Sequence, residues 1–267
     1  MYRFLLRPRW LLFHLLCIVA VVLLINLGFW QLRRLDERQA FNGLVEDRID
    51  QPAVRLEEAL AVASPDELEW RSVTARGEYL VDEQLVVVNR SQDGRAGDIV
   101  VTPLLLDDGR VLLVERGFVP FGVEASQAPP GPVDIVGRLR PSDERRRGQL
   151  SDPSIGDLAV AQRLDIDRLA AQLPGPPVEA YVELTASTPA ETGPFPSPLD
   201  EPELSEGSHL SYAGQWFIFA VGVVVGWYFA VRHSLRSRRA DAARVASRAP
   251  AGGRAREAVA APPSSPG

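Results

Sequence analysis

The stretch HLSYAGQWFIFAVGVVVGWYFAVRH, residues 209–233, places a histidine, a tyrosine, a glutamine and a tryptophan at the start of an otherwise apolar run. An earlier stretch, LINLGFWQLRR at residues 24–34, carries Phe-Trp-Gln close to its end. The later stretch carries the same triplet in reverse, as Gln-Trp-Phe. Two apolar segments with mirrored polar ends decide how the rest of the chain is interpreted.

Both apolar segments are long enough to cross a bilayer as helices. The runs at residues 11–29 and 213–231 contain almost no polar side chains, and roughly 20 residues are needed for one helical span. Neither run shows the polar stripe that a helix at the surface of a soluble core would carry. We therefore expect one transmembrane helix at residues 11–30, and an interface turn with a second transmembrane helix at residues 209–231.

The first segment has a second interpretation, as a cleaved signal peptide. Its basic start fits that interpretation, but the exit sequence Gly-Phe-Trp-Gln, residues 28–31, lacks a small-residue cleavage site. An uncleaved membrane anchor is the favoured interpretation, and the signal peptide is the alternative.

Arginine placement predicts the orientation in the membrane. Three arginines lie in residues 1–10 and eight in residues 232–267, and positive charge favours the cytoplasmic side. We expect a multi-pass protein of the cell membrane with both termini cytoplasmic and residues 31–208 outside the cytoplasm. The mirrored triplet fits this arrangement, because an exiting and an entering helix would each place tryptophan at the same lipid headgroup level. The lipid bilayer is thus one expected partner.

The segment between the spans is acidic and rich in strand patterns. Its surplus of Asp and Glu would repel nucleic acid phosphates, so we expect no nucleic acid partner. β-Branched runs recur over residues 70–140, and Asp108-Gly109 predicts a hairpin turn between two of them. Short helical patterns occur at residues 55–62 and 164–173.

The expected fold is therefore a membrane protein of the α+β class. Two transmembrane helices flank a β-rich extracytoplasmic domain with a few short helices. The proline-rich residues 186–208 are expected to form an extended connector back to the membrane. The arginine-rich residues 232–267 are expected to form a disordered cytoplasmic tail.

Histidine and cysteine are too scarce for several kinds of catalytic site. The chain has three histidines, His14, His209 and His233, and one cysteine, Cys17. A Ser-His-Asp or Cys-His site in the β-rich domain lacks its base, and a zinc site lacks its ligands. No glycine-rich phosphate loop is present. We expect a protein that is not an enzyme, although paired carboxylates leave a hydrolase open as an alternative.

His209 is the most informative of these residues. On a helix, His209, Tyr212 and Trp216 lie at i, i+3 and i+7, and hence on one side. An imidazole there can ligate a metal or haem iron, with aromatic rings to pack on a macrocycle. The alternative is a histidine at the helix start that bonds to lipid headgroups or backbone.

Arg116 is a second candidate, because it precedes Gly117 at the end of an apolar strand pattern. A guanidinium at that place can be presented to a carboxylate, such as a haem propionate. The alternative is an arginine paired with one of the many acidic residues of the chain.

Three motifs in order resemble the surfeit locus protein one family: LGFWQLRRLDERQ at residues 27–39, GDIVVTPLLLDDGRVLLVERGFVP at residues 97–120, and HLSYAGQWF at residues 209–217. The resemblance extends over about residues 11–235. Phe118 departs from the family pattern, which has a tryptophan after Arg-Gly.

The resemblance implies an assembly factor that helps install haem a in the catalytic subunit of haem-copper cytochrome c oxidase. That subunit is then the main partner, and a haem a synthase is a further one. In bacterial members a histidine at the start of the second span contacts haem a, and His209 occupies the matching position. Trp30, Gln31, Gly117 and Trp216 match other motif positions. The expected haem a set, with His209 on the iron, is His209, Tyr212, Trp216, Trp30, Gln31 and Arg116.

Two further functions remain as alternatives at this point. One is a two-span membrane sensor or receptor whose β-rich domain binds a ligand, against which the short cytoplasmic tail argues. The other is the outer-surface hydrolase named above. The resemblance also leaves open whether such a protein carries haem a or acts as a scaffold for the oxidase subunit.

Overall fold

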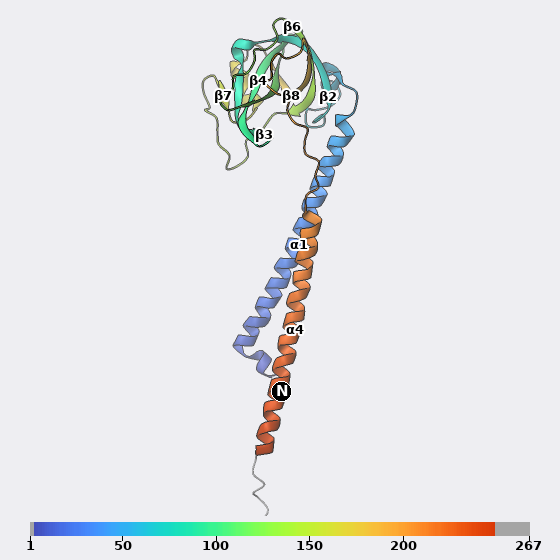
Figure 1. The fold of residues 1–267 in the computed structure, drawn as a ribbon, viewed down its shortest axis with the longest axis vertical. Coiled ribbons are helices and arrows are strands. Elements are labelled where there is room, and N and C mark those ends of the chain that lie inside the picture. Colours follow the sequence, from blue (N-terminus) through green and yellow to red (C-terminus); the bar gives the residue numbers. More distant parts are fainter. Residues whose placement is uncertain (1–2, 249–267) are drawn as a thin grey trace, which may run out of the picture. The chain divides into compact units, whose positions relative to one another are not determined.

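The computed structural model describes residues 3–248 (Figure 1). It confirms a mixed α+β chain with an eight-stranded sheet and two long apolar helices. The chain divides into two compact units. Among the described residues, one unit contains residues 3–38 and 206–248, and the other contains Gln39–Ser205.

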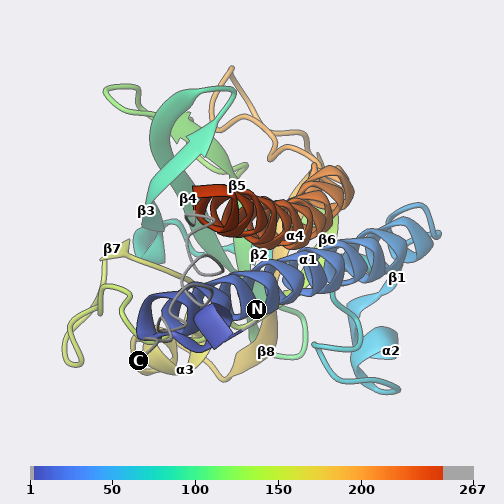
Figure 2. The same cartoon turned by 90° about the horizontal axis from the view of Figure 1, so that it is seen from below.

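The first unit consists of η1 (Arg3–Leu6), most of α1 (Pro8–Ile49) and α4 (His209–Arg248). Figures 1 and 2 both show α1 and α4 running side by side. Both helices are long and apolar enough to cross a membrane, and few residues of their apolar windows are buried within the protein. Proline suits the first turn of α1, where its missing N–H leaves no hydrogen bond unmade.

Small residues bring the two helices close together. A Cβ atom on Gly28 would lie 2.6 Å from Cε1 of Phe217, so the two helices touch where Gly28 has no side chain. The rings of Phe29 and Phe217 meet edge to face, with centroids 5.6 Å apart. Ala213 and Ala220 are both buried on α4. Close approach through glycine and alanine is how apolar helices associate in lipid.

Both long helices extend further than their apolar segments. The first helix continues past the predicted span as far as Ile49, through Asn42-Gly43, a pair that often forms a turn. Asn42 is buried, and its Nδ2 donates to the backbone oxygen of Leu204 across 2.6 Å. Val45 is fully buried one turn later. Tertiary contacts of this kind override a weak local preference.

The prediction of a disordered tail is wrong for its first part. α4 continues through residues 232–248 instead of ending at the apolar segment. Alanine and arginine are strong helix formers, so this composition can propagate a helix that has already been nucleated. The remainder of the predicted tail, residues 249–267, lies outside the described residues.

The second unit is built on one sheet with strand order β1-β2-β6-β8-β5-β4-β3-β7. Its strands are β1 (Val54–Arg55), β2 (Ser72–Tyr79), β3 (Leu85–Gln92), β4 (Arg95–Leu106), β5 (Val111–Pro120), β6 (Pro132–Pro141), β7 (Val160–Ala161) and β8 (Pro177–Thr188). β2 pairs with β6 along its length and with β4 at its end, where Tyr79 faces Leu104. The strands β2, β6, β8, β5 and β4 therefore close into a barrel, from which β3 and β7 extend.

Short helices connect the strands: α2 (Leu56–Leu60), η2 (Val81–Glu83), α3 (Ile166–Leu169) and η3 (Ala170–Gln172). The second short helical pattern is confirmed as α3, which Asp165 caps by accepting a hydrogen bond from the backbone N–H of Arg168. The predicted hairpin is confirmed as well. β4 and β5 pair in antiparallel register across a turn in which Gly109 has a φ of 83°.

Two apolar clusters fill the sheet unit. One comprises seventeen buried residues, which come from α2, from the barrel strands and from Ala128. Leu104, Leu112 and Ile135 are among them. The other lies between β3, β4, β5, β8 and α3, and includes Leu113 and Tyr181. β5 contributes to both clusters, which explains why its sequence reads as a continuous apolar run rather than an alternating one.

The segment predicted as an extended connector is partly ordered against the sheet. β8 continues to Thr188, so the first residues of the segment belong to a strand. Farther along, Phe118 and Ser197 exchange backbone hydrogen bonds of 2.8 and 2.9 Å. Gly117 makes this possible, because it has a φ of 147° and a Cβ atom there would lie 2.1 Å from the carbonyl oxygen of Ser197.

Candidate functional site

His209 is the first residue of α4, and the local backbone places it at an open helix start. The backbone N–H of Tyr212 donates to the carbonyl oxygen of Ser208 across 3.1 Å, which begins the helical hydrogen bonds. Gly207 precedes it with a φ of 69°. A Cβ atom on Gly207 would lie 3.5 Å from Cδ2 and 3.6 Å from Nε2 of His209, so glycine leaves this edge of the ring uncrowded.

His209 is joined to α1 by a hydrogen bond. Its Nδ1 lies 2.8 Å from Oε1 of Gln31. An amide oxygen only accepts, so Nδ1 carries the proton and Nε2 keeps its lone pair in the neutral ring. Histidines that ligate metals typically donate their second N–H in this way, which fixes the tautomer and the ring orientation. The pair therefore has the arrangement of a ligand held by a supporting partner.

The aromatic residues predicted around His209 lie on or near the same side. Tyr212 is 47% exposed, one turn after the histidine. Trp216 is half-buried one turn farther on, and its Nε1 is buried with no hydrogen bond partner among the described residues. Trp30 adjoins Gln31 in α1 and is 46% exposed. The structure thus brings His209 and Gln31 into contact and leaves Tyr212 and Trp30 as exposed ring surfaces nearby in the chain.

These residues fit a haem. One neutral imidazole with a free Nε2 can ligate iron, and exposed aromatic rings can pack on the edge of a porphyrin. Arg33 and Arg34, which follow Gln31 in α1, lie on different sides of the helix, since each residue turns the helix by about 100°. Arg34 lies about 60° around α1 from Gln31, whereas Arg33 lies about 160° away. Arg34 also forms an exposed ion pair with Glu37, at 2.7 Å.

The comparison with known proteins assigns the chain to a family. The model of the SURF1 family matches residues 18–221, which include Gln31 and His209. The chain belongs to the SURF1 family. It is 32% identical over 254 residues to an uncharacterized SURF1-like protein of Mycobacterium tuberculosis, covering 90% of each chain. It is 27% identical over 228 residues to a SURF1-like protein of Rickettsia bellii, covering 83% of this chain and 91% of that one.

A eukaryotic relative is also similar over most of the chain, at a lower identity. A SURF1-like protein of Caenorhabditis elegans is 23% identical over 244 residues, covering 82% of this chain and 74% of that protein. The resemblance seen in the three sequence motifs is therefore confirmed as membership of the SURF1 family, with bacterial and animal relatives.

Arg116 of this SURF1 family member is not available to a ligand outside the sheet unit. Its side chain is fully buried and forms an ion pair with Glu191. Nη1 donates to Oε1 of Gln84 at 3.2 Å, and Nη2 donates to the carbonyl oxygen of Ser126 at 3.1 Å. The expectation that Arg116 contacts a haem propionate is corrected, because its donors are already engaged. The acidic partner that the sequence left open as the alternative is the one the structure shows.

Two groups of residues were missed by sequence reasoning. His14, which reads as an interruption of the first apolar run, accepts a hydrogen bond at Nδ1 from Nε1 of Trp227, at 2.8 Å. The two line an apolar hollow of about 400 Å³ with Cys17. The second group is a set of arginines and buried carboxyl groups in the sheet unit. No short motif marks either group, because the members of each come from distant segments.

No cluster of three or more His, Cys, Asp or Glu suited to a metal ion occurs in the part of the chain that the structure describes. A single histidine ligand can still hold a metal that brings its own equatorial ligands, as haem iron does. His209 would therefore suit a metal that carries most of its own ligands, and not a metal site built from protein side chains alone.

Proposed function

We propose that this protein is an assembly factor for haem-copper cytochrome c oxidase that holds haem a at the start of α4. Membership of the SURF1 family supports the class of function. The observation that carries the haem role is the hydrogen bond from Nδ1 of His209 to Oε1 of Gln31 at 2.8 Å. This hydrogen bond leaves Nε2 as the ring nitrogen that can bind iron.

Each neighbouring residue has a defined part in this proposal. His209 ligates the iron, and Gln31 fixes the tautomer and ring orientation of that ligand. Tyr212, Trp216 and Trp30 supply ring surface against the macrocycle. Arg34 pairs with a propionate in exchange for its exposed contact with Glu37, which is worth little in water. Arg33, on the other side of α1, contacts lipid phosphates.

The proposal also places the chain in a membrane. α1 and α4 cross the cell membrane, both termini are cytoplasmic, and the sheet unit lies outside the cytoplasm, as arginine placement indicates. Haem a, a macrocycle with an apolar tail and two carboxylates, suits a site where an apolar helix pair meets a polar surface. The partners are the catalytic subunit of the oxidase, which receives haem a, and a haem a synthase, which supplies it. The protein performs no chemistry of its own on the haem.

The orientation is testable with single cysteines, because Cys17 is the one cysteine of the chain. In a Cys17→Ser background, an impermeant maleimide should label Ser151→Cys in intact cells. It should label Ser237→Cys only after permeabilisation. Labelling of Ser237→Cys in intact cells would reverse the orientation.

The function is tested by deleting the gene and measuring oxidase activity together with haem a bound to the oxidase. Both should fall, and the wild-type gene should restore both. The His209→Ala gene separates carrier from scaffold: failure to restore haem a supports a carrier, and full restoration supports a scaffold. Normal oxidase after deletion, in cells without a second family member, contradicts the proposal.

A further inference from the structure

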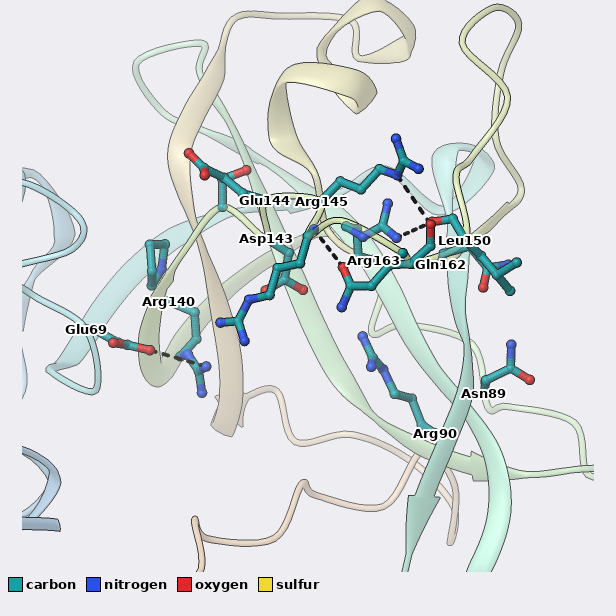
Figure 3. A pocket seen from close by; sticks show the side chains of 15 residues that line it. Glu69, Asn89, Arg90, Arg140, Asp143, Glu144, Arg145, Leu150, Gln162 and Arg163 are labelled. Atoms are coloured by element: carbon teal, nitrogen blue, oxygen red, sulfur yellow. Dashed lines mark hydrogen bonds and ion pairs between the residues drawn. The ribbon is translucent and has the colours of Figure 1, made fainter. Parts of the chain in front are cut away.

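The sheet unit contains a polar hollow of about 1,090 Å³ that is rich in arginine (Figure 3). Five of its lining residues are arginines: Arg90, Arg140, Arg145, Arg146 and Arg163. Three are acidic: Glu69, Asp143 and Glu144. Arg90 and Arg163 come from segments that are distant in sequence from the other three arginines, so no short motif reveals the whole cluster.

The fold assembles this cluster at specific backbone features. Asn89 adopts a φ of 61°, and the pairing of β3 with β4 shifts between Val87 and Arg90. This bulge redirects the end of β3 and the Arg90 side chain with it. Arg140 lies at the end of β6, and Arg163 follows β7. Arg145 and Arg146 lie in the loop after β6.

Two of the five arginines are held by acidic partners. Arg140 pairs with Glu69 at 3.3 Å and with Glu183 at 2.8 Å, and its guanidinium lies 3.8 Å from the ring centroid of Trp70. Arg163 lies 3.8 Å from Asp152. These ion pairs hold the two side chains in place, so their positions do not depend on a bound ligand.

The other three arginines form no ion pair within 4 Å among the described residues. Arg90 is half-buried and extends into the hollow in Figure 3, and its Nε is buried without a hydrogen bond partner. Nε of Arg140 is buried and unpartnered as well. Buried N–H groups are nearly always hydrogen-bonded, because leaving one without an acceptor costs about 1–3 kcal/mol. Arg145 and Arg146 are exposed at the rim.

The buried carboxyl group of Glu115, which interacts electrostatically with Arg90, does not neutralise that arginine. Glu115 of β5 is almost completely buried. Burial, and then the nearby Glu183, raise the pKa of the Glu115 carboxyl to about 8, against the opposing effect of Arg90. At pH 7 this carboxyl is mostly protonated, so the positive charge of Arg90 remains available to a ligand.

We propose that this hollow binds a small polyanion that carries at least two phosphoryl or carboxylate groups. Arginine forks suit both groups, because each presents two oxygens to parallel N–H donors. One anionic group would meet Arg90, and a second would meet Arg145 and Arg146 at the rim. The volume suits a molecule of metabolite size. This site belongs to the unit Gln39–Ser205, whereas His209 belongs to the other unit, so the inference goes beyond the proposed function and does not depend on it.

The test uses the full chain in detergent and two probes, inorganic pyrophosphate and citrate, titrated separately by calorimetry. Trp70, the one tryptophan of residues 39–205, supplies a second signal through its emission, because Arg140 stacks on it. We expect saturable binding of at least one probe, with a change in emission that Trp70→Phe removes. Binding of pyrophosphate alone identifies a phosphoryl ligand, binding of citrate alone a carboxylate, and binding of both the shared chemistry.

Matched arginine variants localise the binding. Arg90→Gln and Arg146→Gln should each weaken binding about tenfold or more, as loss of a charged hydrogen bond implies. Arg95→Gln removes an exposed arginine outside the hollow and should leave the affinity unchanged. Arg146 is exposed, so its variant folds even if the Arg90 variant does not. Absence of saturable binding of both probes, or equal loss in Arg95→Gln, overturns the proposal whatever the outcome at His209.

Discussion

His209 Nδ1 and Gln31 Oε1 lie 2.8 Å apart and join the exit of one apolar helix to the start of the other, across 178 positions of sequence. This contact turns a histidine at a helix start into an oriented ring with one nitrogen committed and the other free. It also distinguishes the two glutamines of the mirrored triplets. Gln31 has a definite partner, whereas Gln215 is exposed.

Replacing Gln31 by alanine should weaken haem retention without abolishing it. Supporting partners of metal-ligating histidines typically contribute 10- to 100-fold in affinity, and we expect a loss of about that size here. The measurement is the haem a content of protein purified from cells that make haem a. Gln215→Ala is the control, and an equal loss in both variants would show that Gln31 has no special role.

Replacing Gly28 by alanine should loosen the helix pair. The added Cβ atom would lie 2.6 Å from Cε1 of Phe217, so either the Phe217 ring or one of the helices must shift. We expect a lower thermal midpoint for loss of bound haem, and recovery in the double variant Gly28→Ala with Phe217→Ala, which removes the obstructing ring. Gly222, whose Cβ position is open, gives the control variant Gly222→Ala. A double variant no better than Gly28→Ala alone contradicts this picture of the interface.

Removing Arg116 should destabilise the sheet unit strongly. Its guanidinium is fully buried, and Arg116→Ala would leave Glu191 with an unpaired charge that is only 18% exposed. Breaking such a buried pair costs about 3–5 kcal/mol of unfolding free energy. Thermal unfolding followed by near-ultraviolet circular dichroism measures the loss. Arg95→Ala should change the midpoint little, and Arg116→Met with Glu191→Leu should recover part of the loss. An unaffected Arg116→Ala midpoint would contradict the structural role.

Stability should fall with rising pH because of Glu115. Its carboxyl has a pKa near 4.5 in the unfolded chain and about 8 in the folded one, where burial disfavours the charge. The folded state therefore holds the proton more tightly between these values, and stability declines as pH rises from about 4.5 to about 8. Because each pKa unit between the two states corresponds to about 1.4 kcal/mol, the full loss of unfolding free energy is about 5 kcal/mol. Above pH 8 both states are ionised and the loss is complete.

Glu115→Gln isolates this effect. The variant lacks the ionisable group, so its unfolding midpoint should decline less over the same pH range than that of the parent. Glu124→Gln alters an exposed carboxyl and serves as the control. Parallel pH curves for Glu115→Gln and the parent would show that Glu115 is not the buried acid responsible.

The features that sequence predicts here depend on short-range signals. Two apolar runs fix α1 and the start of α4, Asp108-Gly109 fixes the β4–β5 turn, and Asp165 caps α3. The closure of the barrel depends on β2 meeting β4 at Tyr79, which no local pattern encodes. The same limit applies to the partner of Arg116, which is 75 residues away.

The candidate site was partly predictable for the same physical reason. Helical periodicity places His209, Tyr212 and Trp216 on one side of a helix, and family resemblance adds Gln31 and Trp30. Neither gives the hydrogen bond to His209, because that contact requires the mutual placement of two helices. The arginine hollow was missed because its members are distributed over four segments of the chain.

The visible spectrum of the full-length protein, purified from cells that make haem a, tests the haem-binding proposal most directly. We predict a Soret band that is lost in His209→Ala and retained in His14→Ala, whose histidine pairs instead with Trp227. A Soret band of undiminished intensity in His209→Ala, or none in the wild-type protein, would contradict His209 as the haem ligand.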